Sequence, residues 1–420
     1  NRMKAAIPKP MLQVLDVPML GWVIRACEGA GLSRICVVTG YKAQYVELYL
    51  GDRYRTALQA EQLGTGHAVM QAEKFMKEFT DGNTLVLCGD APFMDSETIA
   101  NALKLHEAQE NAVTVITANL EQPKGYGRIL RTETGIAAIV EEKDATEAQR
   151  EIHEVNSGAY WFKTKALLEL LGGLSQSNAQ GEYYLTDTVG LALERGWKAS
   201  AYRSENPDVI LGANTRKDLL HLNKVAQERV LDKHMENGVN FVSTDGIIIG
   251  NDVEIGAETT ILPGTILRGK TKIGAKCTIG PNCLIEDCKI GDHVTLNYVQ
   301  AFESEIEDAV KAGPFVHIRP NSHLKNGVKI GDFVEVKNST VGEQTAIAHL
   351  TYVGDSDVGK KVNFGCGTVT VNYDGLKKQR CVIGDNCFIG CNTNLIAPVE
   401  LGKGAYLSLI HISEPTRLDV

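Results

Sequence analysis

The sequence lacks the patterns that identify membrane, secreted and nucleic-acid-binding proteins. No apolar run approaches the roughly 20 residues of a membrane-spanning helix. The opening segment, NRMKAAIPKP, contains no apolar core of a signal peptide. The formal net charge is -9 and Lys and Arg form no continuous stripe, which argues against a nucleic-acid partner. The expected partners therefore include neither nucleic acid nor a membrane.

Patterns of zinc sites and disulfide frameworks are also missing. The sequence contains ten cysteines, and none of them forms a CxxC pair. Cys277 and Cys283 are six residues apart, as are Cys381 and Cys387, and this spacing matches a repeat in the surrounding sequence. Packing explains these cysteines better than disulfide bonds or a metal, and free thiols predict a reducing, cytoplasmic location.

A six-residue repeat of aliphatic side chains dominates the second half of the sequence. The first run holds seven members: Ile249, Ile255, Ile261, Leu267, Ile273, Ile279 and Ile285. Two further runs follow: Ile318, Leu324, Ile330 and Val336, and then Ile383, Ile389, Leu395, Leu401 and Leu407. A period of six fits neither a helix face nor an alternating strand. It fits a chain that turns a corner every six residues and points one aliphatic side chain inward each time.

This repeat predicts a parallel β-helix of hexapeptide coils. Each coil would bury its aliphatic side chains against its neighbours. Glycines that follow repeat positions, such as Gly250 and Gly256, would supply positive φ or room for a close turn. A β-sandwich with regular turns is the alternative. Sandwich strands alternate with a period of two, however, and would not keep a six-residue register through successive steps.

The first half of the sequence predicts an α/β fold with a Rossmann-like, mostly parallel sheet. At 420 residues the chain exceeds one ordinary core, so two domains are expected. Short apolar strands alternate with helical patterns. Helices are expected at 19–30 and 66–79, strands at 34–39, 84–88, 113–118 and 159–162, and a long connecting helix at 214–236.

Polar residues stand at the ends of several expected strands. Asp90 directly follows the region 84–88, and open α/β sheets bind ligands at the carboxyl ends of their strands. Asp90 therefore fits a phosphate-bound metal, although taken alone it is more simply a turn or N-cap residue. The polar, glycine-rich segment 59–68 suits a flat base. Gly127 would let a ligand approach the backbone, and Glu141 and Asn156 suit sugar hydroxyls.

Six motifs of the first half resemble those of one enzyme family: QAEQLGTGHA, GDAP, GYGRI, VEEKDAT, EVNSGAY and NAQGEYYLTD. They are similar to the bacterial bifunctional N-acetylglucosamine-1-phosphate uridylyltransferase / glucosamine-1-phosphate N-acetyltransferase. The resemblance runs through nearly the whole chain and joins both halves in the expected order. It implies that the β-helix is left-handed, against the general preference for right-handed crossovers.

For the first domain, the resemblance implies uridylyl transfer from UTP to N-acetylglucosamine 1-phosphate, with release of pyrophosphate. Asp90 and Asn214 match the ligands of Mg²⁺. The implied contacts to UTP and UDP-N-acetylglucosamine are Arg2 and Lys9 at the triphosphate, Gln59, Gly64 and Thr65 at the uracil, Gly127, Glu141 and Asn156 at the sugar, and Asp90 and Asn214. Taken alone, Lys9 would more often be a surface lysine and Asn214 a helix N-cap.

Both ends of the sequence depart from the family pattern. The family begins with a strand and a Gly-rich phosphate loop ending in Gly-Thr-Arg-Met, of which this chain has Asn1-Arg2-Met3. Such loops cradle phosphate with backbone N–H groups. After Leu407 the segment SLIHISEPTRLDV leaves the hexapeptide register. The expectation is a chain truncated at both ends, with no function assigned to residues 408–420.

For the β-helix, the resemblance implies acetyl transfer from acetyl-CoA to glucosamine 1-phosphate. His349 would be the general base, since imidazole titrates near the working pH; taken alone, it is more simply a solvated surface histidine. The implied sugar-phosphate contacts are Arg319, Lys337, Tyr352, Asn363 and Lys378. The implied acetyl-CoA contacts are Cys366, Asn372, Tyr373 and Cys391, where the family has Ala and Ser in place of the two cysteines.

The predicted organisation is a uridylyltransferase domain at 1–214, a connecting helix at 215–238 and an acetyltransferase β-helix at 239–407. Flat-faced coils and family sites built between subunits predict a homotrimer with closed symmetry. Two alternatives stay open. One is a nucleotidyltransferase of single function whose β-helix only assembles subunits, and the other is an inactive scaffold. His349 and the segment Asn372-Tyr373 favour the bifunctional enzyme, because a structural β-helix needs neither.

Overall fold

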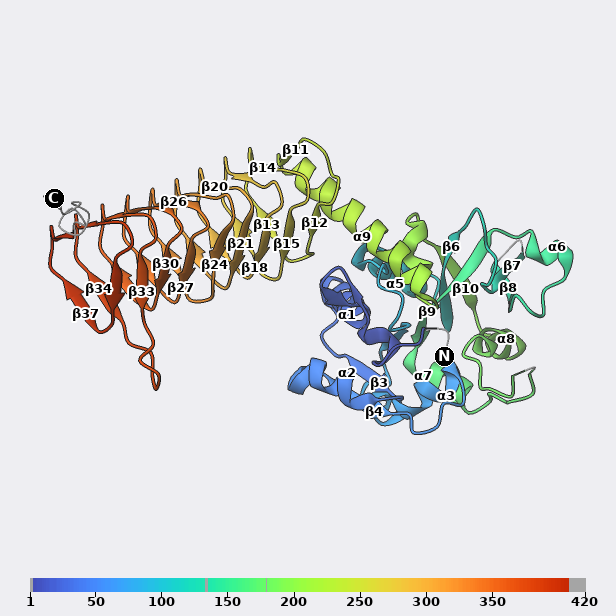
Figure 1. Cartoon of the computed structure of the whole chain (residues 1–420). Helices are drawn as coiled ribbons and strands as arrows, with labels where there is room; N and C mark the ends of the chain where they lie inside the picture. The colour runs from blue at the N-terminus through green and yellow to red at the C-terminus, as the bar shows by residue number, and fades with distance from the viewer. Residues whose placement is uncertain (1–2, 133–134, 179, 408–420) are drawn as a thin grey trace, which may run out of the picture. The chain divides into compact units, whose positions relative to one another are not determined.

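The computed structural model describes residues 3–132, 135–178 and 180–407 of the chain (Figure 1). They form two compact units, and the boundary between the units lies between Asn223 and Lys224. Among the helices of these ranges, none combines the length and the hydropathy that crossing a bilayer requires. The expected fold class is confirmed: an α/β unit precedes a left-handed parallel β-helix.

The first unit is built on a six-stranded sheet with the order β10-β6-β9-β7-β8 and with β5 paired to β9. Its strands are β5 (Asn83–Val86), β6 (Val113–Asn119), β7 (Arg128–Thr132), β8 (Gly135–Val140), β9 (Glu154–Lys163) and β10 (Ala199–Arg203). β10 runs parallel to β6, whereas β9 runs antiparallel to β5, β6 and β7. β5, β6, β7 and β10 therefore point the same way, and β8 and β9 point the opposite way. Smaller ladders join β1 (Gln13–Val14) to β2 (Val17–Pro18) and β3 (Cys36–Thr39) to β4 (Arg55–Leu58).

Helices cover both faces of this sheet. The helices of this unit are α1 (Met19–Gly29), α2 (Ala43–Leu50), α3 (Thr65–Gln71), α4 (Glu73–Met76), α5 (Ser96–Ala108), α6 (Glu147–Arg150), α7 (Thr164–Leu171) and α8 (Asp187–Glu194). Of these, α2 and α3 contact the β3–β4 ladder. Along β9, Tyr160 and Phe162 pack with α7 and α8 in one core, while Ala159 and Trp161 pack with α5 in another. Successive side chains of a strand point to opposite faces, so a strand covered on both sides is apolar throughout.

The long helix α9 (Arg216–Glu236) confirms the helix expected at 214–236. Leu222, Ala226 and Val230 are buried on one face. The chain leaves the helix at Gly238, whose φ is 83° and whose N–H donates to the carbonyl of Met235. Because the boundary between the compact units falls inside α9, the domain limits 1–214, 215–238 and 239–407 stay a prediction.

After α9, the described residues of the second unit, up to Leu407, form three parallel sheets with ten, nine and nine strands. They run from β11 (Asn240–Phe241) to β38 (Tyr406–Leu407), from β12 (Ile248–Ile249) to β36 (Asn394–Ile396), and from β13 (Glu254–Ile255) to β37 (Val399–Leu401). Figure 1 shows the coils stacked one upon the next. Repeat residues of successive coils pair in register, Ile249 with Leu267 and Leu267 with Ile285. All seven members of the first run are buried, which confirms the hexapeptide interpretation.

Glycines of the repeat serve close contact between coils. A Cβ on Gly256 would lie 2.7 Å from the carbonyl carbon of Gly274, and one on Gly274 would lie 2.6 Å from that of Gly291. Neither glycine has positive φ, whereas corner residues such as Asn321 and Asn338 do. At these two glycines, room for the neighbouring backbone is the role that applies, whereas Gly280, which follows Ile279, has a positive φ of 108°.

Candidate active sites

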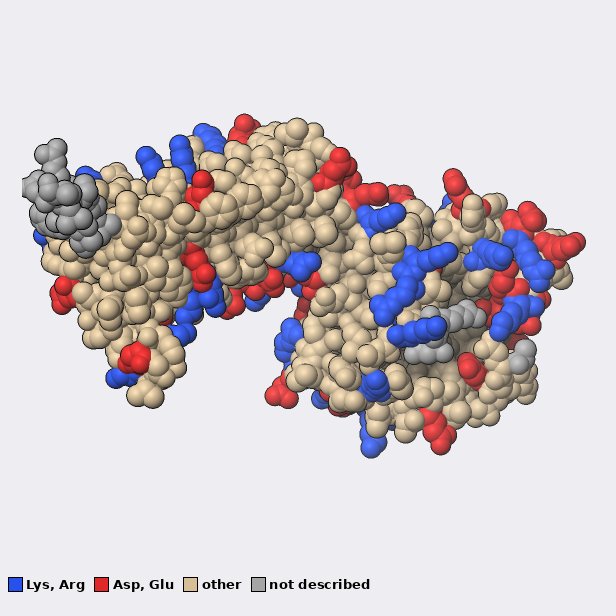
Figure 2. Space-filling model, viewed as in Figure 1, with Lys and Arg blue, Asp and Glu red and all other residues tan. Residues whose placement is uncertain are grey.

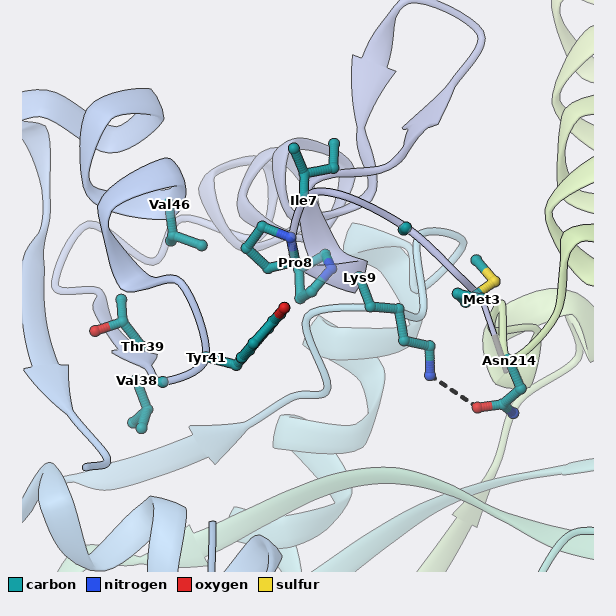
Figure 3. A pocket seen from close by; sticks show the side chains of 12 residues that line it. Met3, Ile7, Pro8, Lys9, Val38, Thr39, Tyr41, Val46 and Asn214 are labelled. Carbon is teal, nitrogen blue, oxygen red and sulfur yellow. Dashed lines mark hydrogen bonds between the residues drawn. The ribbon is translucent and has the colours of Figure 1, made fainter. Parts of the chain in front are cut away.

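Three residues from distant parts of the first unit meet at the expected cation site. The ammonium of Lys9 forms an ion pair with Asp90. The same Nζ donates a hydrogen bond of 2.8 Å to Oδ1 of Asn214. Figure 3 shows Lys9 extended toward Asn214 in a pocket of about 580 Å³ that Met3 and Tyr41 also line. The structure thus brings Lys9, Asp90 and Asn214 together.

The first turn of α9 fixes Asn214. Asp218 Oδ2 accepts hydrogen bonds of 2.8 Å from the backbone N–H groups of Asn214 and Thr215, and Thr215 Oγ1 accepts one of 3.2 Å from the N–H of Asp218. This is reciprocal capping of a helix N-terminus. Burial alone would raise the pKa of Asp218, but these N–H groups and the charge of Lys9 hold it below its usual value. The sequence analysis missed Asp218, although the Asn-Thr-x-x-Asp spacing is a capping signal.

The donor set at this point suits a hard divalent cation. The Asp90 carboxylate and the Asn214 amide offer the oxygen ligands that Mg²⁺ prefers, and both already contact one cation, the Lys9 ammonium. Within the described ranges, no cluster of three or more His, Cys, Asp and Glu side chains could hold a metal. Two protein ligands, with phosphate oxygens and waters in the remaining positions, fit Mg²⁺.

The polar segment before α3 is held against residues 183–185. The Gln59 amide donates a hydrogen bond of 3.1 Å to the carbonyl of Gly64. Gly64 has a φ of 110°, and a Cβ there would lie 2.6 Å from the carbonyl oxygen of Tyr183, so glycine is required. Thr65 Oγ1 accepts a hydrogen bond of 3.0 Å from the N–H of Leu185. Gln59, Gly64 and Thr65 therefore form one ordered edge.

Gly127, Glu141 and Asn156 also lie together. The N–H of Asn156 donates to the carbonyl of Gly127 at 2.9 Å, and a Cβ on Gly127 would stand 3.5 Å from Oε1 of Glu141. The Asn156 amide donates a hydrogen bond of 2.7 Å to the hydroxyl of Tyr160, which orients its side chain. The absence of a Cβ at Gly127 leaves space beside the Glu141 carboxylate.

Further carboxylates surround this position. Burial, with the nearby charges of Asp144 and Asp187, raises the pKa of Glu141, and burial raises the pKa of Asp187 itself. The sequence analysis did not single out Asp144 and Asp187, although both lie in quoted motifs, VEEKDAT and NAQGEYYLTD. Only the folded chain brings these two motifs to the same carboxylate.

In the second unit, His349 ends strand β29 (Ala346–His349) and is exposed. Its backbone carbonyl accepts a hydrogen bond of 2.7 Å from Thr351 Oγ1. Within the part of the chain that the structure describes, no hydrogen bond holds the imidazole ring. The ring is thus free to meet a ligand.

Lys337, Lys378 and Asp355 form a charged cluster near Tyr352 and Asn372. Lys337 Nζ lies 3.5 Å from Oδ2 of Asp355, which also accepts a hydrogen bond from the Asn372 amide. That amide lies 3.1 Å from the Tyr352 hydroxyl. The adjacent Lys337 lowers the pKa of Lys378. Two neighbouring ammonium groups provide a site for a phosphate or similar anion.

The other predicted residues of the second unit lie around this cluster without joining it. Arg319 pairs with Glu335 at 2.8 Å. Asn363 and Cys366 lie on the coil after that of His349, and Cys391 lies one coil further. The Cys366 carbonyl accepts a hydrogen bond of 2.7 Å from the N–H of Asn392. The remaining residue, Tyr373, is exposed and pairs with Lys378 across the loop that follows β33 (Val369–Val371).

Two parts of the sequence interpretation fall outside the described residues. One is Arg2, which was expected at the triphosphate. The other is the segment 408–420, to which no function was assigned.

Comparison with known proteins gives matches over both units. A protein-family model described as nucleotidyl transferase matches residues 4–209, and one described as a hexapeptide repeat of succinyl-transferase matches residues 380–408. Curated relatives named "Bifunctional protein GlmU" match nearly the whole chain. That of Acetivibrio thermocellus is 46% identical over 409 residues, covering 97% of this chain and 88% of the relative. That of Thermoanaerobacter pseudethanolicus is 47% identical over 409 residues, covering 97% and 89%. That of Streptococcus agalactiae is 44% identical over 406 residues, covering 96% and 88%.

Proposed function

This chain belongs to the family of bifunctional GlmU proteins, and from that premise we propose which of its residues act in each of two reactions. The chain is a bifunctional transferase of UDP-N-acetylglucosamine synthesis, a supply route for peptidoglycan and other cell-wall precursors. One activity acetylates glucosamine 1-phosphate with acetyl-CoA. The other transfers uridylyl from UTP to N-acetylglucosamine 1-phosphate and releases pyrophosphate.

In the uridylyl transfer, an oxygen of the sugar phosphate forms a bond to the α-phosphorus of UTP while the bond from that phosphorus to pyrophosphate breaks. Such chemistry depends on positioning and charge neutralisation. We assign Asp90 and Asn214 to hold Mg²⁺, and Lys9 and Arg2 to neutralise the triphosphate. Bound Mg²⁺ would stabilise negative charge on the phosphates. The observation that carries this assignment is the ammonium of Lys9 in contact with both Asp90 and Asn214.

Substrate selection in the first unit rests on two groups of residues. We assign the edge formed by Gln59, Gly64 and Thr65 to uracil, whose planar amide groups can pair with backbone and side-chain amides. Gly127, Glu141 and Asn156 would receive the sugar. Glu141 is half-buried, which raises its pKa, and a carboxylate shielded from water accepts hydrogen bonds from sugar hydroxyls strongly.

In the acetyl transfer, the amine nitrogen of glucosamine 1-phosphate attacks the thioester carbonyl of acetyl-CoA, and the coenzyme A thiolate leaves. We assign His349 to accept the proton from that amine; its ring is exposed and uncommitted among the described residues. Arg319, Lys337 and Lys378 would hold the sugar phosphate, and Tyr352 and Asn363 would orient the sugar. Cys366, Asn372, Tyr373 and Cys391 would line the acetyl-CoA side.

We also propose that the chain works as a homotrimer in the cytoplasm. Four exposed apolar side chains stand at matching corners of successive coils and form what we call the apolar ridge: Tyr298, Phe315, Phe333 and Leu350. The centroids of neighbouring rings along the ridge are 5.2 Å apart. Charged side chains gather toward the edges of the β-helix face seen in Figure 2. Apolar patches of this kind mark protein contacts, and Leu350 directly follows His349, so a neighbouring copy would complete the site.

Two assays on the purified chain test the proposed function. One supplies UTP, Mg²⁺ and N-acetylglucosamine 1-phosphate and measures pyrophosphate; the other supplies acetyl-CoA and glucosamine 1-phosphate and measures free coenzyme A. We expect both products. Pyrophosphate alone would favour a nucleotidyltransferase with a structural β-helix, and neither product would favour a scaffold.

His349→Ala then separates a general base from a surface histidine. We expect it to lower the rate of acetyl transfer by about 10²- to 10⁴-fold, the usual contribution of a positioned base. Binding of glucosamine 1-phosphate should change much less, since the phosphate contacts remain. Acetylation at the parental rate would show that the ring plays no part.

A further inference from the structure

Asp355 is a buried carboxylate at a corner of the β-helix, between β30 (Tyr352–Gly354) and β31 (Ser356–Val358). The residue is 4% exposed and has a φ of 48°. No role was assigned to it above, yet its side chain touches several residues of the proposed acetyl-transfer site. A carboxylate this far from water is costly unless its partners compensate.

The backbone of the corner explains the residue type only in part. Asn321, Asn338 and Asp355 occupy this corner in successive coils, each with positive φ and each followed by a serine. Asn and Asp tolerate this conformation better than most residues. Asn321, however, is exposed, whereas the side chain of Asp355 is buried. Asparagine would satisfy the corner equally well, so the negative charge requires another reason.

Both oxygens of Asp355 are engaged. Oδ1 accepts a hydrogen bond of 2.5 Å from the amide of Asn338. Oδ2 accepts one from the amide of Asn372 and lies 3.5 Å from Nζ of Lys337. Burial alone would raise the pKa of Asp355, but these hydrogen bonds and the charges of Lys337 and Lys378 hold it below its ordinary value. The carboxylate is therefore ionised among two ammonium groups that would otherwise repel each other.

Asp355 also holds the N-terminal end of the loop 372–380. This end begins with Asn372, the first residue after β33. The C-terminal end is held by Arg380, which donates two hydrogen bonds of 2.9 and 2.6 Å to Asp357. Within the loop, Tyr373 pairs with Lys378. The position of the Lys378 ammonium thus depends on the end of the loop that Asp355 anchors.

We propose that Asp355 is a positioning residue for the phosphate of glucosamine 1-phosphate. It holds Lys337 and Lys378 side by side and fixes one end of the loop 372–380, so that both ammonium groups can bind the phosphate. This rests on the proposed acetyl-transfer function. The carboxylate supplies the counter-charge before substrate arrives, and the phosphate adds a second anion to a preformed pair of cations. Preorganisation of this kind lowers the cost of binding.

Limited proteolysis tests the anchoring without any substrate. The loop contains Lys377, Lys378 and Arg380, after which trypsin can cut. Asp355→Asn keeps the shape but removes the charge and turns one oxygen into a donor that faces other donors. We expect cleavage in the loop to be about tenfold faster or more, as expected for the loss of charge-assisted hydrogen bonds.

Steady-state kinetics test the link to the sugar phosphate. We expect Asp355→Asn to raise KM for glucosamine 1-phosphate by about tenfold or more and to leave kcat nearly unchanged, the signature of lost binding rather than lost chemistry. Asn338→Gly should act in the same direction but less strongly. Glycine accepts the positive φ there, so that variant decides the matter should Asp355→Asn fail to fold. Asn321→Gly, at the same corner one coil earlier, is the control and should match the parent.

Parental cleavage and parental KM in Asp355→Asn would overturn the proposal. So would faster cleavage with an unchanged KM, which would reduce Asp355 to a loop anchor. If the parent chain does not acetylate glucosamine 1-phosphate at all, the proposed function fails instead. The cleavage rates would then still report whether Asp355 anchors the loop.

Discussion

At the scale of single residues, Lys9 links parts of the first unit that are far apart in sequence. Its ammonium contacts Asp90, after β5, and Asn214, before α9. The ion pair offsets the negative charge of Asp90. Under the proposed function, the same lysine would neutralise charge on the triphosphate of UTP.

The two-site assignment predicts that Asp90→Ala strongly slows uridylyl transfer and spares acetyl transfer. Loss of one of two protein ligands for Mg²⁺ should cost several kcal/mol of transition-state stabilisation, about 10³-fold in rate. Asp81→Ala, which removes an exposed carboxylate of the same unit (side chain 90% exposed), is the control and should leave both rates unchanged. Equal loss of both activities in a folded Asp90→Ala chain would contradict separate sites.

The buried imidazole of His106 predicts how stability depends on pH. Burial, with the charge of Lys163, lowers the pKa of His106 to about 4, whereas an unfolded chain has a value of about 6.5. Between those values the unfolded state binds a proton that the folded state does not, so the free energy of unfolding falls as pH decreases from about 6.5 to 4. His106→Gln should make this fall shallower.

Urea unfolding at several pH values measures the effect. His221→Gln is the matched control, because His221 is exposed and its replacement should leave the slope of the parent chain. A slope in His106→Gln equal to that of the parent would show that this imidazole does not contribute.

At the scale of elements, the local patterns were sufficient wherever burial alone selects the residues. The six-residue period alone was enough to predict the buried aliphatic column of the β-helix. In that column Ile318 pairs in register with Val336, as the period requires. The sequence did not indicate that β9 would run against β5, β6 and β7, because strand direction depends on long-range pairing. Asp355 was missed for a similar reason, because local backbone geometry explains a polar residue at a corner until its distant partners Lys337 and Asn372 are known. Asp218 could have been found from its local capping spacing, and only its proximity to Lys9 required the fold.

The buried aliphatic column of the β-helix predicts that truncating one of its side chains greatly lowers the free energy of unfolding. Ile318 in β24 (Val316–Ile318) is 0% exposed, so Ile318→Ala should leave a cavity and cost about 2–5 kcal/mol. Ile396→Ala, at a site that is 71% exposed, should cost less than about 0.5 kcal/mol.

Spectroscopy can assign that loss to one unit. The three tryptophans, Trp22, Trp161 and Trp197, all belong to the first unit. If the units unfold separately, Ile318→Ala should shift the transition seen by far-UV circular dichroism and leave that seen by tryptophan fluorescence. A coincident shift of both signals would contradict independent domains.

At the scale of the whole molecule, the apolar ridge carries the prediction of a homotrimer. Phe333→Asp should dissociate it, because a carboxylate cannot be buried at an apolar contact without a partner. Phe333 has a φ of 56°, and Asp tolerates that conformation, so the variant should fold. Acetyl transfer should fall with dissociation, while uridylyl transfer should continue, since its assigned residues all belong to the first unit.

Sedimentation at micromolar concentration, with both assays, decides this. Gln344→Asp is the control: it introduces the same charge at an exposed corner with a φ of 56° outside the ridge, and it should stay trimeric. A parent chain that sediments as a monomer would refute the trimer. A trimeric Phe333→Asp chain would instead show that subunits meet elsewhere, and the site beside His349 would then have to be complete within one subunit.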